Sequence, residues 1–142
     1  MRYLGLDLGT KTLGLSLSDK TNTLASPYET LHFKEQDYLS VLASLEKIVK
    51  EKEITDFVLG LPKNMNNSLG FASERSLEFK KILEEYFSLP VHLVDERLST
   101  VEAEKILLLS DKSRKKRKKV IDNVASSLIL DTFLKGRKKE NE

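Results

Sequence analysis

The first part of the chain alternates apolar residues with polar or small ones. Residues 3–8 read Tyr-Leu-Gly-Leu-Asp-Leu and residues 13–17 read Leu-Gly-Leu-Ser-Leu, with the polar residues 9–12 between them. A period of two is typical of half-buried strands, so the pattern predicts two strands joined by a tight turn. Residues 24–31 predict a weaker third strand, in which Pro27 favours a position at the edge of a sheet.

The hydrophobic pattern then changes to helical spacing interrupted by short apolar runs. Apolar residues recur at helical spacing over 38–49 and predict an amphipathic helix of about four turns. Short apolar strands are predicted at 56–61, before Pro62, and at 91–94. The segment between these strands predicts a helix whose apolar positions include Phe71, Leu77, Phe79, Ile82, Leu83 and Tyr86.

Two helices are predicted after the last strand. Residues 99–102, Ser-Thr-Val-Glu, match a capping box and predict the start of the first. Residues 120–134 have the pattern of a last amphipathic helix, with Ile121, Val124, Leu128 and Phe133 expected to face the core.

These elements predict an α/β fold with a five-stranded mixed sheet of order 3-2-1-4-5, flanked by helices. The 142 residues fit one domain, which we assign to residues 1–136, followed by a short charged tail at 137–142. The chain has no apolar run long enough to span a bilayer and no signal-peptide pattern, so we expect a cytoplasmic protein that does not enter membranes. The absence of cysteine excludes disulfides, thiolate metal sites and cysteine nucleophiles.

The formal net charge of +2 is unevenly distributed. Residues 111–142 hold eleven Lys and Arg against five Asp and Glu, whereas residues 1–110 hold thirteen against seventeen. A basic end is typical of contact with nucleic acid. From charge alone, a solvated tail explains it equally well.

Three carboxylates stand out, and each also has a structural explanation. Asp7 could cap a turn, Glu96 could join a surface salt-bridge cluster, and Asp122 could favour the dipole of the last helix. The strand order, however, places the strands of Asp7 and Glu96 on either side of the strand that contains Gly60. If the last helix packs beside them through Ala125 and Ser126, the three residues form an oxygen-only cluster that suits Mg²⁺ or Mn²⁺.

Such a cluster has a chemical consequence. Three converging carboxylates repel one another, and a bound divalent cation removes that repulsion. Carboxylate-held metal can activate water and stabilise the oxygens of an in-line displacement at phosphorus. The residues therefore predict hydrolysis of phosphodiester bonds.

Four ordered motifs carry a resemblance over essentially the whole chain. They are Gly5-Leu6-Asp7-Leu8-Gly9-Thr10-Lys11 continuing to Ser18-Asp19, Gly60-Leu61-Pro62-Lys63-Asn64-Met65-Asn66, Asp95-Glu96-Arg97-Leu98-Ser99-Thr100, and Ile121-Asp122-Asn123-Val124-Ala125 with Leu128-Ile129-Leu130. This set resembles the YqgF family of RNase H-like proteins, described as candidate pre-16S rRNA nucleases and as relatives of the RuvC Holliday junction resolvase. The resemblance implies an RNase H-like nuclease with Asp7, Glu96 and Asp122 as its acidic, metal-binding site.

The chain departs from the family pattern at several positions. Thr12 stands where arginine is usual, Asn66-Asn67 where Asp-Gly or Asn-Gly is common, and Ser126 where a second alanine is usual. Resolvases of the RuvC type place another aspartate where this chain has Ala125, so a four-carboxylate, two-metal site would need Asp95. Alternation along a strand places Asp95 and Glu96 on opposite sides.

Basic residues provide candidate contacts for phosphate. Lys11 and Arg97 adjoin the acidic residues and are expected to orient the scissile phosphate. The run 112–119 precedes Asp122 and is expected to bind nucleic acid with little sequence preference; its candidate contacts are Arg114, Lys115, Lys116, Arg117, Lys118 and Lys119. His32 and His92 are expected to be structural or exposed.

Several functions remain open from the sequence. The resemblance implies processing of the 5′ end of pre-16S rRNA in ribosome biogenesis, with pre-rRNA as a partner and the ribosome as a further candidate partner. The alternatives are resolution of branched DNA and a weakly catalytic ribosome-assembly module. The segment 6–10 also resembles the first phosphate loop of sugar kinases and actin, but those proteins use two such domains. Cutting a symmetric junction would favour a homodimer, and trimming one RNA end a monomer.

Overall fold

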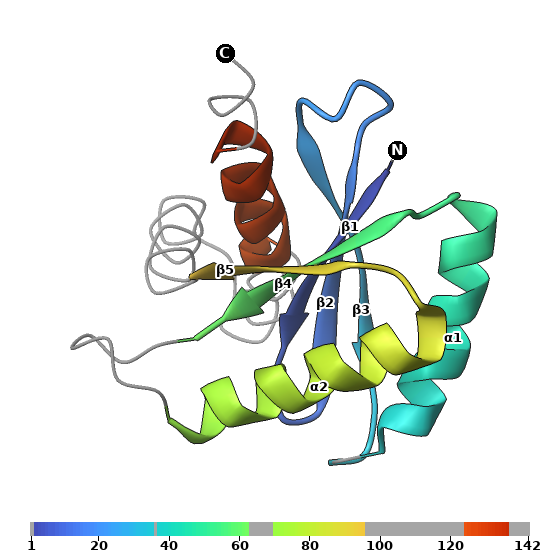
Figure 1. Cartoon of the computed structure of the whole chain (residues 1–142), viewed down its shortest axis with the longest axis vertical. Helices are drawn as coiled ribbons and strands as arrows, with labels where there is room; N and C mark the ends of the chain where they lie inside the picture. The colour runs from blue at the N-terminus through green and yellow to red at the C-terminus, as the bar shows by residue number, and fades with distance from the viewer. Residues whose placement is uncertain (1, 36, 63–69, 96–123, 137–142) are drawn as a thin grey trace, which may run out of the picture.

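The computed structural model describes residues 2–35, 37–62, 70–95 and 124–136 (Figure 1). These residues contain a five-stranded sheet with the strand order β3-β2-β1-β4-β5, as the sequence predicts. The strands are β1 (Tyr3–Leu8), β2 (Thr12–Ser18), β3 (Ala25–His32), β4 (Asp56–Leu61) and β5 (Val91–Asp95).

The sheet combines an antiparallel and a parallel half around the central strand β1. Strand β1 pairs antiparallel with β2, and β2 antiparallel with β3. On the other side, β1 pairs parallel with β4, and β4 parallel with β5. The carboxyl ends of β1, β4 and β5 therefore meet at one edge of the sheet, where ligands gather in folds of this class.

Helices cover both faces of the sheet. Helices α1 (Tyr38–Glu51) and α2 (Phe71–Phe87) share a large apolar core with one face. The C-terminal helix, residues 124–136, packs through Ile129, Leu130 and Leu134 against Tyr3 and Val58 on the other face (Figure 1). No helix in the described part of the chain is long and apolar enough to cross a membrane.

Local sequence explains which side of α1 is buried and where α2 ends. The buried residues of α1 are Val41, Leu42, Leu45 and Ile48, so one stripe of the helix faces the sheet. Ser88 caps the carboxyl end of helix α2. Its backbone is left-handed (φ 56°), and its N–H donates to the carbonyl of Glu84. Pro90 follows and the chain enters β5. Two apolar positions of α2, Leu77 and Tyr86, remain exposed.

The C-terminal helix buries a face that agrees only in part with the expected one. Its buried residues are Ala125, Ser126, Ile129, Leu130 and Leu134, and Phe133 is half-buried but packs against the same core, as predicted. The prediction was wrong for Val124 and Leu128, which are only half-buried, because apolar residues occur on two sides of this helix and the side with Ala125 and Ser126 approaches the sheet closely. Ile121 and the capping box at 99–102 lie outside the described residues, as does the tail at 137–142.

Candidate functional site

Asp7 lies next to the last residue of β1, on the face that the C-terminal helix covers. Tyr3 packs in the apolar core between this helix and the sheet, and a Cβ added at Gly5 would lie 2.9 Å from the Cβ of Leu130. Side chains alternate along a strand, so Asp7 shares the face of Tyr3 and Gly5. Its side chain is half-buried at the carboxyl edge of the parallel strands.

Glycines flank Asp7 on both neighbouring strands. Gly14 of β2 lies directly opposite Asp7. On the other side, Leu6 pairs with Leu59, so the next pair along the strands brings Gly60 level with Asp7. Neither neighbouring strand therefore places a side chain directly beside that of Asp7. A carboxylate in such a setting is a suitable ligand for a hard divalent cation.

The C-terminal helix runs antiparallel to β1, with its amino end toward the carboxyl end of β1 (Figure 1). Phe133, late in the helix, packs against Tyr3 with ring centroids 5.3 Å apart. Ser126, near the amino end of the described helix, lies over Gly5 and Ser16. Asp122 itself lies outside the described residues.

Asp95 belongs to the other face of the sheet. Val91 packs in the apolar core between the sheet and helices α1 and α2, whereas Val94 packs against the core between the sheet and the C-terminal helix. Alternation along β5 therefore assigns Asp95, opposite Leu61, to the side of α2. Of the two neighbouring acidic residues, Asp95 is thus on the face away from Asp7. Glu96 and Arg97 lie outside the described residues.

Lys11 lies in the tight turn that follows β1. The N–H of Gly9 donates to the carbonyl of Thr12 at 2.8 Å, which closes the turn. The N–H of Phe33 donates to the carbonyl of Lys11 at 2.9 Å and ties the turn to the end of β3, while the side chain of Lys11 is exposed. The basic residues 114–119 lie outside the described residues.

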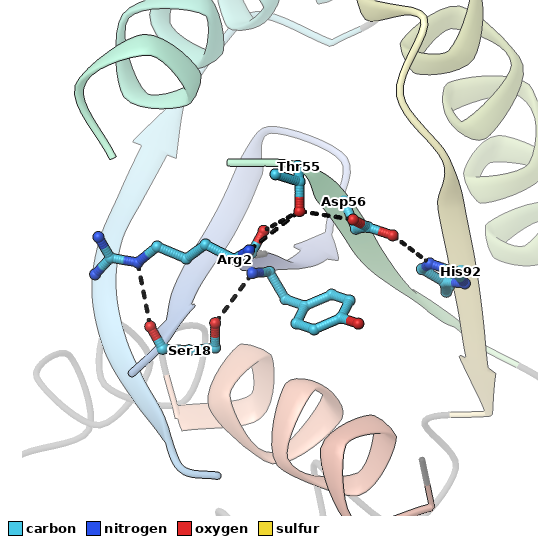
Figure 2. Close-up of polar contacts among 6 residues, drawn as sticks. Arg2, Ser18, Thr55, Asp56 and His92 are labelled. Carbon is cyan, nitrogen blue, oxygen red and sulfur yellow. Dashed lines mark hydrogen bonds and ion pairs between the residues drawn. The ribbon is translucent and has the colours of Figure 1, made fainter. Parts of the chain in front are cut away.

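A polar network that the sequence did not indicate closes the opposite, amino edge of the sheet (Figure 2). The Oδ2 of Asp56 lies 2.9 Å from Nε2 of His92, and Thr55 donates to Oδ1 of Asp56 at 2.7 Å. Arg2 donates from Nε to the carbonyl of Ser18 at 3.3 Å. The His92 ring also packs on Phe133, with centroids 4.8 Å apart. His92 therefore has a structural setting, and it lies at the edge away from Asp7.

The described part of the chain brings no group of three metal-ligating side chains together, because two of the three expected carboxylates lie outside it. Sequence reasoning also missed the contact between Ser16 and Ser126. The sequence signal for it was a row of small residues on one face of β2, Gly14, Ser16 and Ser18, together with the small residues Ala125 and Ser126 of the last helix.

Comparisons with known proteins agree with this geometry. A family model described as "RuvX: Holliday junction resolvase" matches residues 1–136. A protein of Geobacillus sp. (strain WCH70) is 49% identical over 137 residues, covering 96% of this chain and 99% of its own length. A protein of Bacillus subtilis (strain 168) is 48% identical over 134 residues, covering 94% of this chain and 97% of its own. Both relatives are named as candidate pre-16S rRNA nucleases.

The fold is also that of a solved structure, T. thermophilus RuvC in complex with a Holliday junction substrate. Its TM-score is 0.61 at 14% identity, and the match covers 98% of this chain and 96% of that chain. The likeness identifies the predicted RNase H-like fold.

Proposed function

Because this chain belongs to the RuvX (YqgF) family, we propose that it is a metal-dependent nuclease that hydrolyses phosphodiester bonds in nucleic acid. Its curated relatives are named as nucleases, which are hydrolases that act on ester bonds. The observation that carries the proposal is the placement of Asp7. The residue lies at the carboxyl edge of the parallel strands, between two glycines and on the face of the sheet that the C-terminal helix covers.

The proposed metal ligands are Asp7, Glu96 and Asp122. Position 96 has the sequence parity of His92 and Val94, the residues of β5 on the Asp7 face. Position 122 precedes Ser126 by four residues in the sequence, and Ser126 contacts Ser16, the partner of Gly5. All three ligands are oxygen donors, which favours Mg²⁺ or Mn²⁺ over zinc.

A divalent cation at this site would promote deprotonation of water and stabilise the charge that develops on the phosphate oxygens. The protein's own basic residues would hold the substrate. Lys11, four residues after Asp7, and Arg97 are proposed to orient the scissile phosphate. The run 114–119 is proposed to bind the flanking backbone through phosphate contacts.

The proposed substrate is the 5′ end of pre-16S rRNA, in ribosome biogenesis. Support comes from the names of relatives at 44–49% identity, which together outweigh a likeness of fold at 14% identity. That likeness makes a four-way DNA junction the second candidate. A nuclease of pre-rRNA would act in the cytoplasm near the ribosome. We also propose residues 1–136 as one nuclease domain and 137–142 as a charged tail.

Substitution of Asp7 by asparagine tests the proposal. Asp7→Asn removes the carboxylate charge at nearly constant size. We expect the rate of Mn²⁺-dependent cleavage to fall by more than the roughly 100-fold that loss of an outer-shell partner costs. Structured RNA with a pre-16S 5′ end and a four-way DNA junction should be assayed in parallel, with product ends identified.

Asp95→Asn is the matched control, since it removes a carboxylate at the same edge but on the other face, and it should cleave like the unmodified protein. The expected products carry a 5′-phosphate and a 3′-hydroxyl. Cleavage without added metal, full activity of Asp7→Asn, or a 2′,3′-cyclic phosphate product would contradict the mechanism. Faster cleavage of the junction than of the RNA would favour the resolvase.

A further inference from the structure

A buried pair of serines joins the C-terminal helix to the sheet. Ser16 of β2 and Ser126 of the helix are both fully buried, with 0% exposure, and are separated by 110 residues in sequence. The Oγ of Ser16 donates to the main-chain carbonyl of Ser126 at 2.9 Å. The two hydroxyl oxygens also lie 3.0 Å apart.

The contact depends on the missing side chain of Gly5. Gly5 pairs with Ser16 across β1 and β2. A Cβ at Gly5 would lie 2.1 Å from the Oγ of Ser16 and 3.2 Å from the carbonyl oxygen of Ser126. The glycine therefore leaves the space in which the side chain of Ser16 reaches the main chain of the helix.

The surrounding contacts between this helix and the sheet are apolar. Tyr3 and Val58 of the sheet meet Ile129, Leu130 and Leu134 of the helix. Apolar burial is favourable but has little directionality, so such a surface tolerates sliding along the helix axis. A buried polar contact can select one register in an apolar interface. The hydrogen bond from Ser16 provides that directionality here. Ser16 pairs with Gly5, which precedes Asp7 by two residues on the same face of β1.

We infer that Ser16 is a positioning residue, which fixes where the C-terminal helix lies along its own axis relative to Asp7, through its hydrogen bond to the Ser126 carbonyl. The inference rests on the proposed function, because the helix is there proposed to bring a second carboxylate to the cation at Asp7. Loss of the hydrogen bond leaves the apolar packing in place and allows the helix to shift along its axis over the sheet. Affinity for the cation should then fall more than the stability of the fold.

Two alanine substitutions separate these effects. Ser16→Ala removes the donor to the carbonyl. Ser126→Ala removes a hydroxyl from the same contact but leaves the bond from Ser16 Oγ to the main chain of residue 126. Ser76→Ala removes another buried serine, in α2 on the opposite face, and controls for the general cost of such a change.

Mn²⁺ affinity of the full chain should be measured by isothermal titration calorimetry, together with the melting temperature. We expect Ser16→Ala to bind Mn²⁺ about 10-fold more weakly, the lower end of the loss seen for outer-shell partners. Ser126→Ala and Ser76→Ala should bind it like the unmodified chain. Unchanged affinity in Ser16→Ala, or affinities that follow the melting temperatures of all three variants, would overturn the inference.

Asp7→Asn in the same titration distinguishes this inference from the proposed function. If Asp7→Asn abolishes Mn²⁺ binding while Ser16→Ala leaves it intact, the role of Ser16 is wrong and the metal site stands. If Asp7→Asn binds Mn²⁺ as tightly as the unmodified chain, the proposed site is wrong, and the role of Ser16 is overturned with it.

Discussion

At the scale of single residues, Gly5 shows how closely helix and sheet approach. The atoms that a side chain there would meet belong to Ser16, Leu130 and Ser126, which come from the neighbouring strand and the C-terminal helix. No special backbone conformation is involved, because the described glycines have no positive φ. The requirement at this position is space alone.

Replacement of Gly5 by alanine should therefore destabilise the protein. Overpacking of a tight core typically costs about 1–3 kcal/mol in the free energy of unfolding. The closest contact would be with the Oγ of Ser16, so the double variant Gly5→Ala/Ser16→Ala should recover part of the loss. Urea unfolding of both variants gives the two values.

Gly136→Ala provides the matched control, because a Cβ there would meet nothing within 4 Å. Its free energy of unfolding should be unchanged or slightly higher, as alanine favours helices. Equal stability of Gly5→Ala and the unmodified chain would show that the helix shifts at no cost, contrary to the tight packing described above.

At the scale of elements, the hairpin of β2 and β3 is held by its own turn residues. The Oδ1 of Asp19 accepts from the N–H groups of Thr23, at 2.7 Å, and Leu24, at 3.2 Å. Oδ2 accepts from the hydroxyl of Thr21. These bonds, that to the Thr23 N–H above all, lower the pKa of Asp19 below its ordinary value of 3.8. The ionised carboxylate thus stabilises the turn.

This shift predicts a dependence of stability on pH. Because the pKa of Asp19 is lower in the folded chain, its contribution is complete above the unfolded value and is lost as the pH falls through the folded value. Asp19→Asn should be less stable near pH 7 and should lose less stability on acidification. Free energies of unfolding measured between about pH 7 and pH 3 test this, and parallel curves for the two proteins would contradict it.

The elements also show what the sequence can predict. All five strands, their order and helices α1 and α2 were predicted within a few residues, because periodicity and Gly or Pro boundaries mark them. In the C-terminal helix, the close approach through Ala125 and Ser126 and the packing of Phe133 were predicted, whereas Val124 and Leu128 were wrongly expected to face the core. The Arg2 contacts were missed because their acceptors are main-chain carbonyls, which have no sequence pattern. Asp7 lies at the expected edge, whereas Glu96 and Asp122 stay predictions.

At the scale of the whole molecule, charge is divided along the chain. Residues 111–142 carry a surplus of six positive charges and residues 1–110 a deficit of four. In the proposed function, the acidic part supplies most of the cation site and the basic part meets the phosphate backbone. Contacts of this kind release counterions and make binding sensitive to salt.

Neutralising the basic run should weaken binding without removing the chemistry. Replacement of residues 114–119 by glutamine is expected to lower nucleic-acid affinity and to flatten the dependence of log K on log salt by up to about 0.9 per lost phosphate contact. Fluorescence anisotropy at several salt concentrations measures both quantities. Cleavage at saturating substrate should persist.

The control replaces lysines of α1 and α2, the helices on the face of the sheet away from Asp7, namely Lys47, Lys50, Lys80 and Lys81. These changes should alter the salt slope much less per charge removed. If both sets of replacements flatten the slope equally, binding reflects net charge alone, and the run has no special role.

The central position of β1 has a consequence for how the protein is made. The strand is synthesised well before its parallel partner β4, which follows about fifty residues later, and the helix bonded to Ser16 lies 110 residues beyond that serine. Long-range pairing of this kind is slow, and a nascent chain exposes the unpaired face meanwhile. One face of the sheet therefore stays uncovered until residues 124–136 have been synthesised. If the last helix contributes a ligand, nuclease activity arises only after that helix has formed.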